Sequence, residues 1–181
     1  MNPIKALSKN ISAIYKSSKP GYLCMVVKLN HFQIFGLETM YSINKTNINS
    51  QYNSIKQQLN NSSLKGSRLL KDYINNAYLT IKDDYDRAVY ILLLNDIVVD
   101  EKDKLSCINY IEEIRYIKER IDENPYELMA IKEEVNERIE ELKYDLNENI
   151  ELREFNKARE QCILLNMYMN INEELHYKIN E

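Results

Sequence analysis

The stretch Ile74-Asn-Asn-Ala-Tyr-Leu-Thr-Ile-Lys-Asp-Asp-Tyr-Asp-Arg-Ala-Val-Tyr-Ile-Leu92 decides the fold. Its apolar residues recur three and four positions apart, which is the period of an amphipathic helix. A first helix ends at Lys82-Asp83, and Asp84 opens a second helix that runs to Leu94. The stretch therefore predicts two consecutive helices that meet at Asp83 and Asp84.

The composition of the whole chain agrees with a helical protein. Its 181 residues are 44% hydrophobic and include three glycines and three prolines, too few for the many turns of a sandwich or barrel. No run approaches eighteen uninterrupted apolar residues, so we expect no membrane insertion. The predicted class is all-α.

Before this stretch, the sequence predicts one half of a helical hairpin. A helix should start near Asn44 as a cap, and the polar segment 60–67 should form the loop that leads to the helix over Leu69–Ile81. The apolar residues on one face of the earlier helix are Ile48, Tyr52, Ile55 and Leu59.

After a polar link, the second half of the chain predicts three longer helices. They cover Leu105–Asp122, then 125–149 with Asn124 as cap and Pro125 in the first turn, then Glu154–Ile179. Three amphipathic helices that each need to bury a stripe favour an antiparallel three-helix bundle.

Charge divides between the two halves. Residues 1–95 carry 12 Lys/Arg and 5 Asp/Glu, whereas residues 96–181 carry 12 and 23. Such asymmetry is typical of two modules that meet different partners, and a solvated acidic helix face produces the same count. Both interpretations stay open.

The N-terminal segment 1–30 is basic and contains no acidic residue. Its apolar residues recur at helical spacing between serines, as in a transit peptide for mitochondria; a frayed basic arm is the alternative. The apolar run Tyr22–Leu29 that follows Pro20-Gly21 fits either a strand or a buried edge.

Residues suited to catalysis or metal binding are sparse. The cysteines Cys24, Cys107 and Cys162 stand alone, and the histidines are His31 and His176, so we expect no disulfide framework, metal site or cofactor. No glycine-rich phosphate loop or nucleophile with a nearby base is present, which argues against an enzyme. Because the positive charge lies largely in the leader, nucleic-acid binding is not expected either.

Five segments of the sequence together carry a resemblance to a known family. In the first half they are Asn30-His-Phe-Gln-Ile-Phe-Gly-Leu37, Ile74-Asn-Asn-Ala-Tyr78, and Lys82-Asp83 with Arg87-Ala88, Tyr90 and Leu92. In the second half they are Tyr110–Ile121 and Phe155–Ile171. These segments resemble the HscB-type J-domain co-chaperones of iron–sulfur cluster assembly, the last two being similar to the scaffold-binding domain of that family. The resemblance covers roughly residues 31–180.

This resemblance implies a J-domain-like helical hairpin over 31–95, followed by a scaffold-binding three-helix bundle over 96–181. The implied partners are a DnaK-type chaperone for the hairpin and the iron–sulfur scaffold protein for the bundle. The implied location is a mitochondrion or a mitosome-like organelle derived from one, with the cytoplasm as the alternative.

The sequence departs from the family in the hairpin loop. J domains stimulate ATP hydrolysis through His-Pro-Asp, and the alignment places Asn60, Asn61 and Ser62 at these positions. An asparagine cannot carry an imidazolium charge, Asn61 lacks the fixed φ of proline, and Ser62 has no carboxylate. We therefore expect client binding to be retained and ATPase stimulation to be reduced.

The scaffold-contacting positions of the family fall at Ile111, Arg115 and Met167, with Tyr168 beside them. Methionine can replace an aromatic contact, and an arginine stem can cover apolar surface. Ordinary core or surface packing is the alternative for each residue. For the chain as a whole, the alternative is a helical interaction subunit without chaperone activity, dimerising through its acidic bundle.

Overall fold

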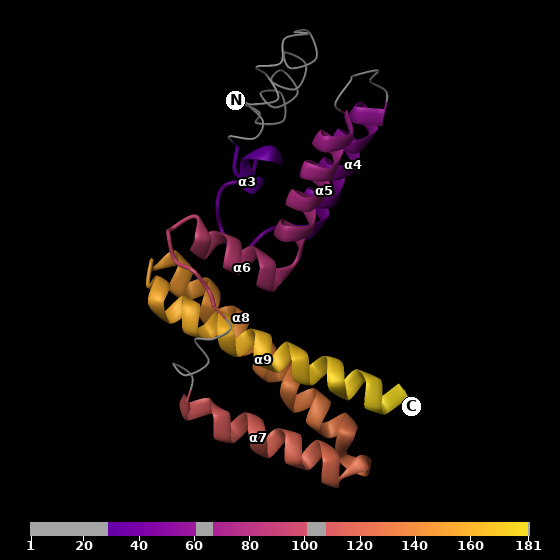
Figure 1. Ribbon diagram of the computed structural model, residues 1–181, viewed down its shortest axis with the longest axis vertical. Coiled ribbons are helices and arrows are strands. Elements are labelled where there is room, and N and C mark those ends of the chain that lie inside the picture. Colours follow the sequence, from indigo (N-terminus) through magenta and orange to yellow (C-terminus); the bar gives the residue numbers. More distant parts are fainter. Residues whose placement is uncertain (1–28, 61–66, 101–107, 181) are drawn as a thin grey trace. The chain divides into compact units, whose positions relative to one another are not determined.

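The computed structural model describes residues 29–60, 67–100 and 108–180, and most of these residues are helical (Figure 1). Over these ranges no strand occurs, and the predicted all-α class is confirmed. Residues 1–28, which include the run Tyr22–Leu29 up to Lys28, and the loop residues Asn61 and Ser62 lie outside the described residues.

The chain divides into two compact units, of which the first ends at Arg87 and the second begins at Ala88. Helix α6 (Asp84–Leu93) continues through this point without a break. The domain boundary expected at 95/96, in the polar link after α6, stays a prediction.

The first unit begins with the short helix α3 (His31–Ile34), which packs on α5 (Ser67–Lys82). Asn30 caps it, because its side chain accepts a hydrogen bond from the Gln33 amide while the Gln33 side chain accepts one from the Asn30 amide. Gly36 ends the turn with a φ of 62°, a conformation that favours glycine.

Helices α4 (Lys45–Asn60) and α5 form the predicted antiparallel hairpin. Asn44 caps α4, since its side-chain oxygen accepts a hydrogen bond of 3.0 Å from the Asn47 amide. The stripe predicted on α4 is largely buried, with Ile48, Ile55 and Leu59 in the core and Tyr52 partly exposed.

Asp83 makes the corner between α5 and α6. Its carboxylate accepts hydrogen bonds of 2.9 Å from the amides of Tyr85 and Asp86, so it caps α6. Helix α6 ends at Leu93, and Asp96 in the turn that follows is left-handed, with a φ of 61°. The predicted end of one helix at Lys82-Asp83 and start of the next at Asp84 are confirmed.

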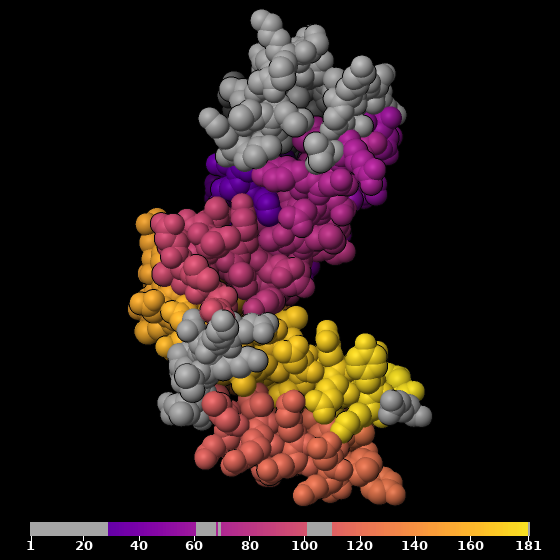
Figure 2. All heavy atoms as spheres, in the orientation of Figure 1, coloured from indigo at the N-terminus to yellow at the C-terminus, as the bar shows by residue number. Residues whose placement is uncertain are grey.

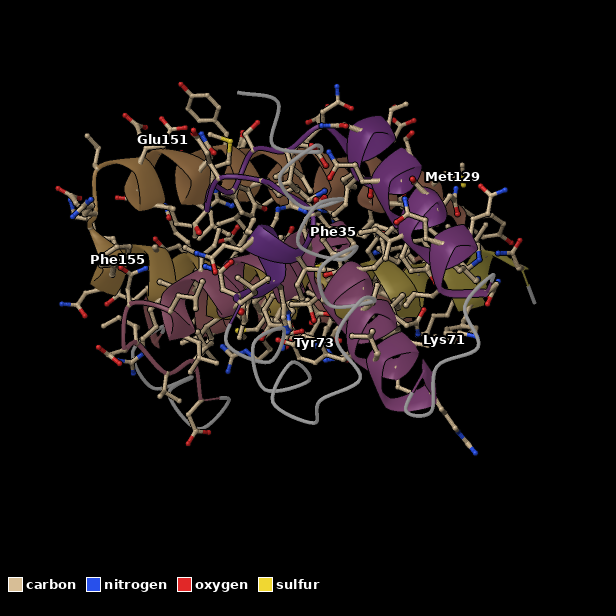
Figure 3. The ribbon with its side chains drawn as sticks, turned by 90° about the horizontal axis from the view of Figure 1, so that it is seen from above. Phe35, Lys71, Tyr73, Met129, Glu151 and Phe155 are labelled. Carbon is tan, nitrogen blue, oxygen red and sulfur yellow. The ribbon has the colours of Figure 1, made fainter. Side chains whose placement is uncertain are left out.

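The second unit contains the three-helix bundle of α7 (Ile108–Glu123), α8 (Leu128–Glu151) and α9 (Phe155–Asn180). Helices α8 and α9 pack along each other, joined by a turn in which Arg153 adopts a φ of 59°. In Figure 3, Glu151 and Phe155 mark the end where α8 turns into α9, and Met129 marks the other end of α8. The predicted stripe of α8 is buried: Ile131, Val135, Ile139, Leu142, Leu146 and Ile150.

The start of the helix predicted over 125–149 differs from the expectation. Pro125–Glu127 forms a short 3₁₀ turn, and Asn124 makes no side-chain capping bond. The Asn124 amide instead donates to the carbonyl of Arg120, so this residue finishes α7. The predicted Asn124 cap is therefore wrong, because the backbone of Asn124 completes the last turn of α7 and Pro125 then begins a 3₁₀ turn.

No helix among the residues that the structure describes is both long enough and apolar enough to cross a membrane.

Candidate functional site

Two tyrosines hold the α4–α5 hairpin together on its surface. The rings of Tyr52 and Tyr78 stack with centroids 3.9 Å apart and planes 13° from parallel. The Tyr52 hydroxyl donates to Asn75 on α5, and the Tyr78 hydroxyl donates to Asn49 on α4, at 2.9 and 2.7 Å. The two helices are thus joined by reciprocal bonds as well as by aromatic contact.

Two lysines extend this stack at both ends. The ammonium of Lys56 lies 5.4 Å from the centre of the Tyr52 ring, and that of Lys82 lies 5.4 Å from the Tyr78 ring. Both distances are within the range of cation–π attraction. We call this row of Lys56, Tyr52, Tyr78 and Lys82 the hairpin stack.

A hollow of about 190 Å³ lies between α4 and α5 toward the loop end of the hairpin, next to the hairpin stack. Lys56 and Asn60 line it from α4, and Lys71 and Asp72 line it from α5. Figure 3 labels Lys71 on α5. The hairpin therefore offers cationic and hydrogen-bonding groups at this end.

Of the three positions that replace His-Pro-Asp, the structure describes Asn60, which is the last residue of α4 and is exposed. Its place beside the hollow puts an amide side chain where the resemblance puts a histidine. The role of this position stays a prediction.

In the bundle, α7 and α9 run parallel in a constant register. The Tyr168 hydroxyl meets Glu113, Glu174 meets Lys118, and Lys178 meets Asp122. The partners lie 55 or 56 positions apart in the sequence each time. Met167 consequently lies at the same level of the bundle as Ile111 on α7.

The predicted contact residues Ile111, Arg115 and Met167 are all at least partly exposed. Ile111 is 40% exposed, which is unusual for an isoleucine in a bundle, and Met167 is half-buried. Arg115 is exposed and makes only a loose pair with Glu119, at 3.8 Å. We call these three residues the docking edge. Figure 2 shows atoms of α7, in salmon, at the surface of the bundle.

Tyr168 does not belong to this surface. It is 1% exposed, and its hydroxyl donates a hydrogen bond of 2.6 Å to the Glu113 carboxylate. The expectation that Tyr168 contacts a partner directly is corrected, because the ring packs inside the bundle. The signal was present in the sequence, since Tyr168 lies three residues from both Leu165 and Ile171 of the buried stripe.

The electrostatic surroundings of Tyr168 keep its hydroxyl protonated. Burial raises the pKa of Tyr168, and the hydrogen bond to Glu113 raises the pKa further, while Arg138 on α8 opposes this rise. The hydroxyl therefore acts as a donor to the carboxylate throughout the physiological range.

Groups for catalysis or metal binding do not gather in the described part of the chain. There, no set of three or more His, Cys, Asp or Glu residues could hold a metal ion. Burial raises the pKa of the Cys162 thiol to about 12, so this cysteine is a core residue without nucleophilic character. Cys24 and Cys107 lie outside the described residues.

Comparison with known proteins adds the decisive observation. Over 161 residues the chain is 26% identical to the iron–sulfur cluster co-chaperone protein HscB homolog of Arabidopsis thaliana. The chaperone HscB from Vibrio cholerae matches the fold with a TM-score of 0.77 at 20% identity, covering 83% of this chain and 98% of that one. The chain thus resembles HscB-type proteins in sequence and in fold.

Two further structures agree with this HscB-type fold. The human co-chaperone protein HscB has a TM-score of 0.77 at 18% identity and covers 83% of this chain and 82% of its own. The Jac1 co-chaperone from Saccharomyces cerevisiae has a TM-score of 0.71 at 17% identity, with 81% and 92% covered. No family model matches the sequence.

The match to the plant protein covers 83% of this chain and 64% of the plant protein. The chain thus spans less than two thirds of the length of that curated relative. The structural matches show the fold, which comprises the hairpin and the three-helix bundle that the sequence predicted.

Proposed function

We propose that this chain is an adaptor co-chaperone of iron–sulfur cluster assembly. In this proposal the bundle binds the iron–sulfur scaffold protein as client, and the hairpin brings it to a DnaK-type chaperone. The similarity to the plant iron–sulfur cluster co-chaperone over 161 residues supports both halves of the proposal, because it extends across both units.

The docking edge is the observation that carries the client-binding half. Ile111 and Met167 come from different helices to the same level of the bundle, and Ile111 keeps 40% of its surface exposed. Apolar side chains that stay exposed beside a charged group are typical of the centre of a protein interface. Arg115, one turn along α7, supplies that charge and can bind an acidic residue of the client.

The hairpin supports the chaperone-binding half through its cationic groups. Lys56, Lys71 and Lys82 are distributed over both helices, with Lys56 and Lys82 held on the hairpin stack. A positive surface favours an acidic partner and accelerates encounter with it. Because Asn60, Asn61 and Ser62 replace His-Pro-Asp, we infer weak stimulation of the ATPase.

We also propose a mitochondrial location, or a mitosome-like one. The acid-free, lysine-containing leader of residues 1–30 supports it. A fusion of residues 1–30 to a fluorescent reporter should enter the organelle, and the same fusion with the leader lysines changed to glutamate should stay in the cytosol. Cytosolic signal from the unchanged fusion would favour the cytoplasmic alternative.

A second candidate is a helical interaction subunit without chaperone activity. The departure at Asn60, Asn61 and Ser62 favours it, because those side chains lack the groups that the J-domain reaction uses. Such a subunit would dimerise through its acidic bundle. Size-exclusion chromatography with light scattering distinguishes a dimer from the monomer expected of an adaptor.

A pull-down with two purified partner proteins tests the proposal. Immobilised chain should retain the iron–sulfur scaffold protein, and a cognate DnaK-type chaperone should join in the presence of ATP. If neither partner protein is retained and light scattering shows that the chain is a dimer, the interaction subunit is favoured.

A further inference from the structure

Helix α7 is held to the bundle differently from the other two helices. Among the side chains that the structure describes on α7, two are buried, Ile114 and Ile121. Helices α8 and α9 bury six and eight residues respectively. Since apolar burial is the main term that fixes a helix in a bundle, α7 depends more on polar contacts for its orientation.

These polar contacts lie along two sides of α7. Lys118 and Asp122 pair with Glu174 and Lys178 of α9, on the side that also carries Ile111 and Arg115, because the four residues recur at helical spacing. Arg120 pairs with Glu134 of α8 through two bonds of 2.6 and 3.1 Å on the other side. Residues Glu113 and Arg120 are seven apart and share that side.

Most of these ion pairs lie at the surface, where such pairs contribute little. The bond between Tyr168 and Glu113 differs, because the Tyr168 ring is 1% exposed and the donor is fixed inside the bundle. A short bond from a hydroxyl to a carboxylate is roughly twice as strong as a neutral one. It is therefore the contact best able to fix the rotation of α7 about its own axis.

The direction of this bond matters for the docking edge. Successive residues of a helix are about 100° apart, so Glu113 lies about 160° around α7 from both Ile111 and Arg115. The Tyr168 side chain extends from α9 to the carboxylate of Glu113, which lies on the side of α7 that faces α8. If this bond were lost, α7 could rotate and turn Ile111 away from Met167.

We infer that Tyr168 and Glu113 are positioning residues for client docking, which hold α7 in the rotation that aligns Ile111 and Arg115 with Met167. This inference rests on the proposed function, since the docking edge is the client surface. Neither residue needs to touch the client. Tyr168 acts from the interior, and Glu113 acts from the far side of α7.

The test is calorimetric titration of the full chain with the iron–sulfur scaffold protein. Tyr168→Phe keeps the ring and removes the hydroxyl, and should weaken binding about five-fold, as expected for loss of a charge-assisted bond. Glu113→Gln keeps an acceptor without the charge and should have a smaller effect in the same direction. The double variant should be no weaker than Tyr168→Phe. Tyr144→Phe, on an exposed tyrosine of α8, is the matched control and should bind as the natural chain does.

Two readouts separate positioning from a general loss of stability. The loss of scaffold affinity caused by Ile111→Ala should be smaller in the Tyr168→Phe background. A merely structural role of Tyr168 would leave that loss of affinity unchanged. In the free protein, hydrogen exchange of α7 amides should accelerate while the amides of α8 and α9 keep their protection.

Each result decides the inference. Unchanged affinity of Tyr168→Phe, with the natural chain binding well, would overturn the positioning role and leave the proposed function standing. If the natural chain does not bind the scaffold, the proposed function fails and the positioning role fails with it. Should Tyr168→Phe fold poorly, Glu113→Gln gives the answer, since it removes one surface charge and leaves the core intact.

Discussion

The Arg87 guanidinium donates a hydrogen bond of 2.6 Å from Nε to the backbone carbonyl of Tyr41. Arg87 is 3% exposed, and its other nitrogens donate to the carbonyl of Ile81 and the carboxylate of Asp84. The Tyr41 ring lies 4.9 Å from the guanidinium carbon. One side chain thus joins the segment before α4 to the corner between α5 and α6.

We predict that Arg87→Ala lowers the free energy of unfolding by about 2–4 kcal/mol, because it leaves buried carbonyl groups without a donor. Arg87→Lys should also destabilise, since an ammonium cannot reach all of these acceptors. Urea denaturation followed by circular dichroism measures both. Arg68→Ala, on an exposed arginine of α5, is the control, and a loss for Arg87→Ala no larger than the control's would refute the prediction.

Asp84 makes the stability of this corner depend on pH. Burial alone would raise the pKa of Asp84, but hydrogen bonds and charge from Lys45 and Arg87 hold this pKa below its ordinary value of 3.8. A carboxyl with a lowered pKa stabilises the fold above the ordinary value and loses that contribution as the pH falls below it. The melting temperature should therefore decline below about pH 4 in the natural chain and less steeply in Asp84→Asn. Parallel declines in the two proteins would contradict this assignment.

The hairpin stack should contribute to stability through both its rings and its hydroxyls. Tyr78→Phe removes the bond to Asn49 and should cost about 0.5–1.5 kcal/mol. Tyr78→Leu should cost more, because it also removes the stacking on Tyr52. Chemical denaturation measures the series, with Tyr144→Phe as an exposed control. Equal stability of Tyr78→Phe and the natural chain would show that the reciprocal bonds add nothing.

The hairpin and the bundle could be predicted because their helices carry strong local signals. The stripe of α8 recurs at spacings of three and four over six buried residues, and Gly36 and Asp83 stand where their backbone and capping chemistry is needed. Both the period and the caps are local properties of the sequence. Where the structure describes them, the helix ends accordingly agree with the predicted ends to within three residues, and the largest difference is at the start of α8.

The contacts between helices could not be predicted in the same way. Arginine is almost always exposed, so nothing local indicates that Arg87 lies in the core. Asn124 has the chemistry of a cap, yet its amide completes α7 and its side chain makes no capping bond. The pairing of Tyr168 with Glu113 depends on the register of two helices 55 positions apart, which a single sequence does not specify.

The loop prediction concerns ATPase stimulation. The combined change Asn60→His, Asn61→Pro and Ser62→Asp should raise stimulation of a cognate DnaK-type chaperone, because it restores a charged imidazole, a fixed φ and a carboxylate. A steady-state ATPase assay measures it, and scaffold affinity should stay the same because the bundle is untouched. Full stimulation by the natural chain, without gain from the restored loop, would mean that the chaperone is reached through another surface.

The most direct test of the account is the affinity of the full chain for the iron–sulfur scaffold protein, with and without Ile111. We predict saturable binding that Ile111→Ala weakens by more than about 1 kcal/mol, as truncation of a central apolar anchor does. Met129→Ala, on a methionine of α8 that is 60% exposed against 40% for Ile111, should leave the affinity unchanged. Equal affinity for the natural chain and Ile111→Ala would contradict the docking edge, and absence of binding by the natural chain would contradict the adaptor function itself.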